Sequence, residues 1–125
     1  EGERFSPWQF ALHCAYWKRS VTRQLEAHLG RPMEQSAHRF ELADWVATPP
    51  AAGTAEWTEC LDGLCQEHEA LVAACQELVR DPDKLNLIEA GSGFSWAQYV
   101  YGMAAHDVYH TAQLRNLGIP GLAKA

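Results

Sequence analysis

Apolar side chains recur every three or four residues along three long stretches of the chain, and no stretch alternates in the manner of a strand. Such spacing places the apolar side chains on one face of a helix, so we expect helices over about residues 7–29, 55–80 and 96–117. A chain of 125 residues has room for one domain with one core. The sequence therefore predicts a single all-α domain over residues 1–125, most simply a helical bundle.

Capping residues mark the boundaries of these helices. Ser6 and Gln9 form a capping box at the start of the first helix, and Gly30 ends it. Ser95 and Gln98 repeat the capping box before the third helix. The same chemistry at two distant positions supports both starting points.

The two linkers carry weaker signals. The first, residues 30–53, is long and proline-rich at its end, and we expect a short helical turn around Met33–Phe40. The second, Asp81 to Phe94, contains Gly91, Ser92 and Gly93 and is expected to be mobile.

Three long amphipathic helices are one fewer than such bundles usually contain. The chain also begins at Glu1 without a methionine. We therefore expect either a further helix before Glu1 in the natural protein, which would make residues 1–125 an N-terminally truncated domain, or a partner chain in a homodimer that supplies the missing wall.

The charge balance argues against binding to nucleic acid. Ten basic and sixteen acidic side chains give a net charge of −6, whereas phosphate contacts need a cluster of Lys and Arg. The densest basic stretch is Lys18 and Arg19 followed by Arg23, which we expect on one exposed helix face. No apolar run approaches the length of a membrane span, and no signal peptide is apparent.

The four cysteines, Cys14, Cys60, Cys65 and Cys75, occur singly within helical patterns. Zinc-binding cysteines usually come in closely spaced pairs, so we interpret these as reduced, buried, apolar side chains. Reduced cysteines predict a cytoplasmic location.

Two regular seams of side chains, spaced alternately by three and four residues, run along the second and third helices. In the second helix the seam consists of Trp57, Leu61, Leu64, His68, Leu71, Cys75 and Leu78. In the third helix it consists of Trp96, Tyr99, Met103, His106, His110, Gln113 and Leu117. Two histidines and a glutamine thus occupy positions where leucine or isoleucine would be expected.

His106 and His110 are one helical turn apart, so their rings lie on the same side and can share a metal ion. A third ligand must come from another helix, and either His13 or His68 could supply it. His68 is centred on its seam while His13 lies toward the flank of its own, so periodicity alone does not select His13. His28 and His38, at a helix end and in the linker, are expected to be solvated.

The chain resembles the DinB/YfiT-like family over nearly its whole length. The similarity rests on Ser6-Pro7-Trp8 leading into Leu12-His13-Cys14-Ala15-Tyr16-Trp17-Lys18, on Ala105-His106-Asp107-Val108-Tyr109-His110-Thr111-Ala112-Gln113-Leu114, and on Gly118-Ile119-Pro120-Gly121. The resemblance implies a four-helix bundle whose first helix is absent from this chain. It also implies that His13, His106 and His110 bind a divalent metal. His68 then becomes a core residue or a neighbour of the site, with a fourth ligand as the alternative.

Three histidine ligands leave a coordination position open for water or substrate. Characterised relatives include enzymes that use a low-molecular-weight thiol as transferases or isomerases, so the resemblance implies a metal-dependent enzyme acting on a small molecule. Zn, Ni and Fe fit three histidines comparably. Asp107 and Gln113 are candidates for orienting the ligands, and Tyr16 and Tyr99 either line a pocket or simply pack.

A second hypothesis is a non-catalytic helical module. In that case the histidines form a structural metal site or a hydrogen-bonded network in the core. A role in the DNA damage response rests on the family name alone.

Overall fold

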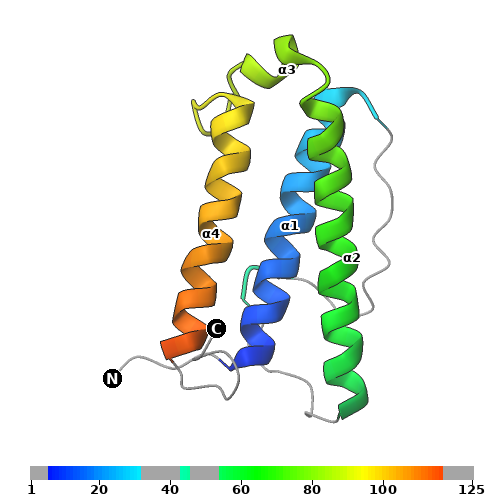
Figure 1. Ribbon diagram of the computed structural model, residues 1–125, viewed down its shortest axis with the longest axis vertical. Coiled ribbons are helices and arrows are strands. Elements are labelled where there is room, and N and C mark those ends of the chain that lie inside the picture. The colour runs from blue at the N-terminus through cyan, green and yellow to red at the C-terminus, as the bar shows by residue number, and fades with distance from the viewer. Residues whose placement is uncertain (1–5, 32–42, 46–53, 117–125) are drawn as a thin grey trace.

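A computed structural model of the protein describes residues 6–31, 43–45 and 54–116 (Figure 1). These residues form four helices: α1 (Pro7–Leu29), α2 (Thr54–Leu78), α3 (Pro82–Asn86) and α4 (Trp96–Asn116). Within this part of the chain there is no strand, only one isolated bridge between Ile88 and Ser95. The all-α prediction is confirmed, and the three long helices lie where the hydrophobic pattern placed them.

Both predicted capping boxes are present. The backbone N–H of Ser6 donates to Gln9 Oε1 over 2.8 Å, and the backbone N–H of Gln9 donates to Ser6 Oγ over 3.3 Å. Ser95 and Gln98 make the same pair of bonds, over 3.0 and 3.2 Å. Gly30 closes α1 at a φ of 75°, a left-handed conformation that glycine adopts without strain. The turn predicted around 33–40 and the predicted stop after α4 lie outside the described residues.

The linker from Asp81 to Phe94, for which no helix was predicted, contains one. It begins with α3, where Asp81 accepts a hydrogen bond from the backbone N–H of Lys84 over 3.2 Å and Pro82 occupies the first helical position. An Asp-Pro pair stops one helix and starts another equally well. The sequence reading used only the stop.

The helix α1 lies between α2 and α4, as Figure 1 shows. Near α3 all three long helices share one apolar cluster, made by Val21, Leu25, Leu71, Ala74, Leu78, Trp96 and Met103. At the opposite end a second cluster joins only α1 and α2, through Trp8, Ala11, Leu12 and Cys60. There α4 meets α1 through histidines instead.

The seam predicted for α2 is only partly buried. Leu71 and Leu78 are buried, but Leu61 is 38% exposed and His68 is exposed too. The buried face is rotated toward Cys60 and Glu67. The reason is that α2 packs mainly against α1, and the rest of its apolar face borders a groove between the described helices α2 and α4.

This groove between α2 and α4, with α1 beneath it, contains two cavities of about 320 and 360 Å³ that both border Lys18 and Asp107. Its walls are mostly apolar, with Leu64 and Val72 on the α2 side and Leu114 on the α4 side. The described helices therefore leave an elongated apolar surface open along one side of α1.

No described helix combines the length and the apolar character that crossing a bilayer requires.

Candidate metal centre

Three imidazole nitrogens converge between α1 and α4. The Nε2 atom of His13 lies 3.1 Å from that of His106 and 2.9 Å from that of His110, and the last two are 3.0 Å apart. The described residues offer no other group of three such ligand atoms. The three side chains thus lie within reach of a single ion.

The helices explain this convergence. His106 and His110 are separated by one turn of α4 and lie on its buried seam, as predicted. His13 faces them from α1 and is 4% exposed, while His110 is 6% exposed and His106 is half-buried. His68, the competing candidate for the third ligand, lies on the far side of Lys18 and does not join the group.

The chain fixes the proton of His13. Its Nδ1 contacts the carbonyl oxygen of Asp44, and because a carbonyl only accepts, Nδ1 must carry the hydrogen. The indole of Trp45 stacks on the same imidazole, with ring centroids 3.8 Å apart and planes 10° from parallel. The Nε2 lone pair of His13 therefore points toward the other two histidines.

His110 is held in the same state. Its Nδ1 donates to Gln113 Oε1 over 2.6 Å, so its Nε2 also presents a lone pair. Gln113 was predicted to orient a ligand, and it does contact the distal nitrogen of one. Such acceptors behind an imidazole are typical of metal-binding histidines.

His106 lacks this support. Its Nδ1 is buried without a hydrogen-bond partner among the described residues, as is Asp107 Oδ1, which lies 4.0 Å away. The distance exceeds that of a hydrogen bond. His106 is therefore the least constrained of the three.

The three Nε2 atoms do not form a satisfied hydrogen-bond network. His13 and His110 each present a lone pair across 2.9 Å, and a proton on His106 Nε2 can serve only one of them. Opposed lone pairs at that distance repel, whereas a cation between them accepts all three. The donor set and its orientation therefore fit a divalent metal that takes neutral imidazole ligands.

Burial favours the neutral form of His13 and His106. Desolvation lowers the pKa of His13, and the neighbouring His110 lowers it further, against the opposing effect of the Asp44 carbonyl. Desolvation likewise lowers the pKa of His106, and the neighbouring His110 and His13 lower it further. Metal binding requires the neutral form, so the site is prepared for it near neutral pH.

Lys18 corrects one sequence prediction. It was placed on an exposed face, yet it is 5% exposed, ion-paired with Asp107 and 3.2 Å from Nδ1 of His68. Arg19, beside it, pairs with the buried carboxylate of Glu67 over 3.0 Å. A hydrophobic pattern reveals buried apolar residues but cannot reveal a charge that is buried with its counterion.

His28 also differs from its prediction. Expected to be solvated, it is half-buried, stacks on Trp96 with centroids 4.4 Å apart, and makes a 2.9 Å hydrogen bond from Nε2 to the carbonyl of Lys84. It helps to attach the α3 segment to the end of α1. His38 lies outside the described residues.

The four cysteines are unpaired. Burial raises the pKa of Cys14 and of Cys60 to about 11 and also raises that of Cys75. Cys65 is exposed, contrary to the prediction of uniform burial. The three thiols with raised pKa values stay protonated near neutral pH, which makes them poor metal ligands and nucleophiles.

A cavity of about 840 Å³ opens beside the three histidines, between α4, α1 and residues 44 and 45. Tyr99 lines it, and its hydroxyl donates to Gln24 Oε1 over 2.7 Å. Burial raises the pKa of Tyr99, so this phenol is a neutral donor. Tyr16, the other tyrosine considered, is not part of the lining.

Asp44 and Trp45 were missed by the sequence reading. They lie in the long linker, where no periodicity marks them. An isolated Asp-Trp pair in a linker carries no metal-site signal, because Asp44 acts on His13 through its backbone carbonyl. Only the fold brings these residues to the site.

Comparison with known proteins adds no relative: no family model matches the chain, and neither a curated protein nor a solved structure does.

Proposed function

We propose that this protein binds one divalent transition metal through Nε2 of His13, His106 and His110 and acts as a metal-dependent enzyme on a small molecule. The observation that carries the proposal is the convergence of three Nε2 atoms within 3.1 Å, two of them held as lone-pair donors by their surroundings. Without a cation, this arrangement buries opposed lone pairs.

Catalytic rather than structural use is supported by the open cavity at the site. A structural site is usually closed by four protein ligands, whereas here three histidines border a cavity of about 840 Å³. A bound Zn, Ni or Fe ion would supply Lewis acidity, which lowers the pKa of a thiol or water. The chain's own groups orient two of the imidazoles and place their hydrogens on Nδ1, through Asp44 and Gln113, and Trp45 covers one face of His13.

The reaction we propose is a thiol-dependent transfer or isomerisation, with a low-molecular-weight thiol as cosubstrate. It rests on the resemblance to the DinB/YfiT-like family. The chain's own cysteines support an external thiol, because burial raises the pKa of Cys14, beside the site, to about 11.

The same resemblance leads us to propose a DinB-like bundle with a fourth helix in the groove between α2 and α4. The apolar walls of that groove support this proposal. If a second copy supplies the helix, light scattering of the chain will give the mass of a homodimer. A monomer would leave a segment of the same polypeptide as the source.

The proposal is tested by the metal content of the untagged protein after purification and dialysis. We expect about one metal ion per chain, lost in His106→Ala because two imidazoles hold such an ion far more weakly. His68→Ala is the matched control: it removes an imidazole of α2 outside the group of three, and should keep the metal. A stable protein that binds no metal would contradict the proposal.

Activity is tested separately, by incubating the metal-loaded protein with thiols and electrophilic small molecules. Turnover that disappears in His106→Ala but persists in His68→Ala supports the enzyme. A tightly bound metal without turnover in any such assay would support the non-catalytic module with a structural metal.

A further inference from the structure

We infer that the molecule bound beside the three histidines has an uncharged, largely aromatic or apolar body with a single metal-binding head group. The part of the inference that concerns the head group rests on the proposed metal function. The body is inferred independently, from the walls of the cavity.

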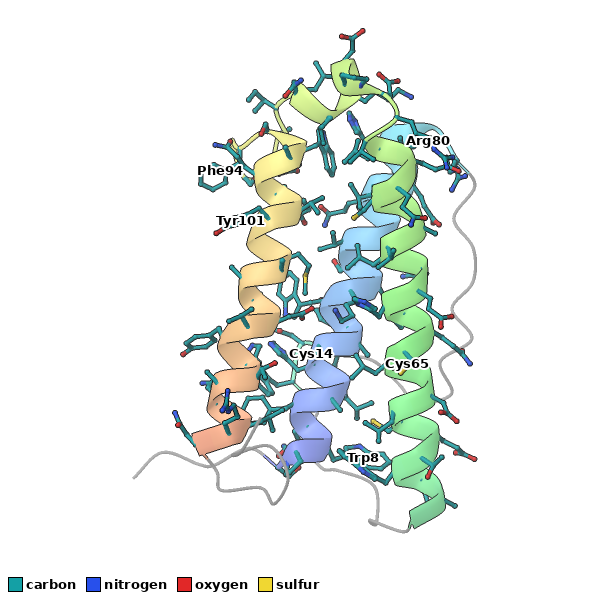
Figure 2. All side chains as sticks on the ribbon, viewed as in Figure 1. Trp8, Cys14, Cys65, Arg80, Phe94 and Tyr101 are labelled. Carbon is teal, nitrogen blue, oxygen red and sulfur yellow. The ribbon has the colours of Figure 1, made fainter. Side chains whose placement is uncertain are left out.

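Those walls are predominantly aromatic. Besides the three histidines and Val21, the described lining residues include five aromatic side chains and one methionine: Trp17, Trp45, Phe94, Tyr99, Tyr101 and Met103. Figure 2 shows Phe94 and Tyr101 projecting from the side of α4 that faces away from α2. They are 56% and 77% exposed, so large apolar surface faces solvent at the rim. Planar apolar groups bind such walls by burial and by stacking.

The described residues that line the cavity offer no positive side chain to an anionic body. Among the described lining residues there is neither lysine nor arginine, and Asp44 is the one carboxylate. That carboxylate already accepts a hydrogen bond from Trp17 Nε1 over 2.8 Å and lies 3.3 Å from His13 Nδ1. Lys18, although buried nearby, is paired with Asp107.

A carboxylate or phosphate on the body would therefore lose its hydration without gaining a counterion, which is unfavourable. Only the head group, beside the three imidazoles, would meet positive charge when the metal is bound. A volume of about 840 Å³ suits a molecule of drug-like size. Among thiols, the inference favours small uncharged ones over those that carry several carboxylates.

The test compares phenylmethanethiol with 4-(mercaptomethyl)benzoate, which have the same shape but differ by one carboxylate. Quenching of tryptophan fluorescence reports binding to metal-free and to metal-loaded protein. We expect the neutral probe to bind about tenfold more tightly, or better, in both forms. If both probes bind more tightly to the metal-loaded protein than to the metal-free protein, that difference measures the contribution of the metal, separately from that of the cavity walls.

Gly102→Lys provides the sharpest variant. Gly102 lines the cavity one turn before His106, and a Cβ at this position meets no atom within 4 Å. A lysine fits there and improves helix propensity. It places an ammonium at the wall, and the preference for the neutral probe should shrink or reverse. Val108→Lys adds the same charge at a position that is 69% exposed and outside the cavity lining, and should change nothing.

Equal affinity for the two probes, or tighter binding of the benzoate, would overturn the inference even if the metal is bound. A preference for the neutral probe in a protein that binds no metal would instead keep the inference about the uncharged body and remove both the metal-binding head group and the proposed function. If Gly102→Lys and Val108→Lys changed the preference equally, the effect would come from net charge, and the cavity would not be the binding site.

Discussion

Leu12 and His13 are consecutive residues of α1 with almost the same burial, 1% and 4% exposed, yet they face different neighbours. Leu12 belongs to the apolar cluster between α1 and α2, which is completed by Trp8, Ala11 and Cys60. His13 faces α4 and meets two further imidazoles. Burial alone therefore does not reveal what a side chain does.

The two sides of α1 differ in the interactions that their buried side chains make. On the α2 side, removal of apolar surface from water is itself stabilising. On the α4 side, around His13, burial desolvates three imidazoles. It also brings Nε2 of His13 and Nε2 of His110, each with its lone pair, within 2.9 Å of each other. Further along, Val21 and Met103 join α1 to α4 by apolar contact. At the level of Leu12 and His13, one side of α1 thus contributes to stability and the other positions candidate ligands.

The largest effect is expected for Leu12→Ala. Removing this side chain leaves a cavity in a closed apolar cluster, and we expect the free energy of unfolding to fall by about 2–5 kcal/mol. Urea unfolding followed by circular dichroism measures it. Metal content at low temperature should stay near one per chain.

Val108→Ala, at an exposed position of α4, is the control and should change stability by less than about 0.5 kcal/mol. A Leu12→Ala protein that is as stable as this control, or that has lost its metal while still folded, would show that the two sides of α1 are not separable.

A smaller effect is expected for Gln113→Leu, which removes the acceptor on Nδ1 of His110. Loss of such an acceptor typically weakens metal binding about 10–100-fold, because the ring and its proton are no longer fixed. Competition with a metal-binding dye measures this affinity. Gln113→Glu keeps an acceptor oxygen at the same position and should retain most of it. If both variants bind like the parent protein, the Gln113 contact has no role in the site.

The smallest effect is expected for the stability of the metal-free protein as the pH is lowered. Because desolvation lowers the pKa of His13 and His106 below the ordinary imidazole value of about 6.5 in the folded protein, the unfolded chain takes up protons first as pH falls. Stability of the metal-free protein is therefore fully present above about pH 6.5 and declines below it, toward the lower folded pKa values. The decline should be shallower in His106→Gln, which has one such group fewer. A stability that rises between pH 6.5 and 5.5 would contradict this sign.

Much of the fold follows from local sequence signals. Alternating spacings of three and four residues placed the long helices, and Ser6 and Ser95 marked two of their starts. The short helix α3 was missed because Asp81-Pro82 was interpreted only as an end. Local capping signals thus define helix boundaries well, but they do not show whether a linker contains a short helix of its own.

The candidate site was predictable in part. Two histidines on an apolar seam identify His106 and His110, whereas periodicity favoured His68 over His13. Periodicity fails there because α1 is buried on two sides, so a residue on the flank of one stripe is central to another. Asp44, Trp45 and the buried Lys18 escaped because long-range packing, absent from any local pattern, gives them their partners.

The most direct measurement is X-ray absorption at the edge of the bound metal in the loaded protein. We expect three imidazole nitrogens at about 2.0–2.1 Å, with light atoms such as water oxygen completing the shell. In His13→Ala one imidazole should disappear from the spectrum or the metal should be lost. A shell with fewer than three imidazoles in the parent protein, or sulfur at about 2.3 Å from a cysteine, would contradict it.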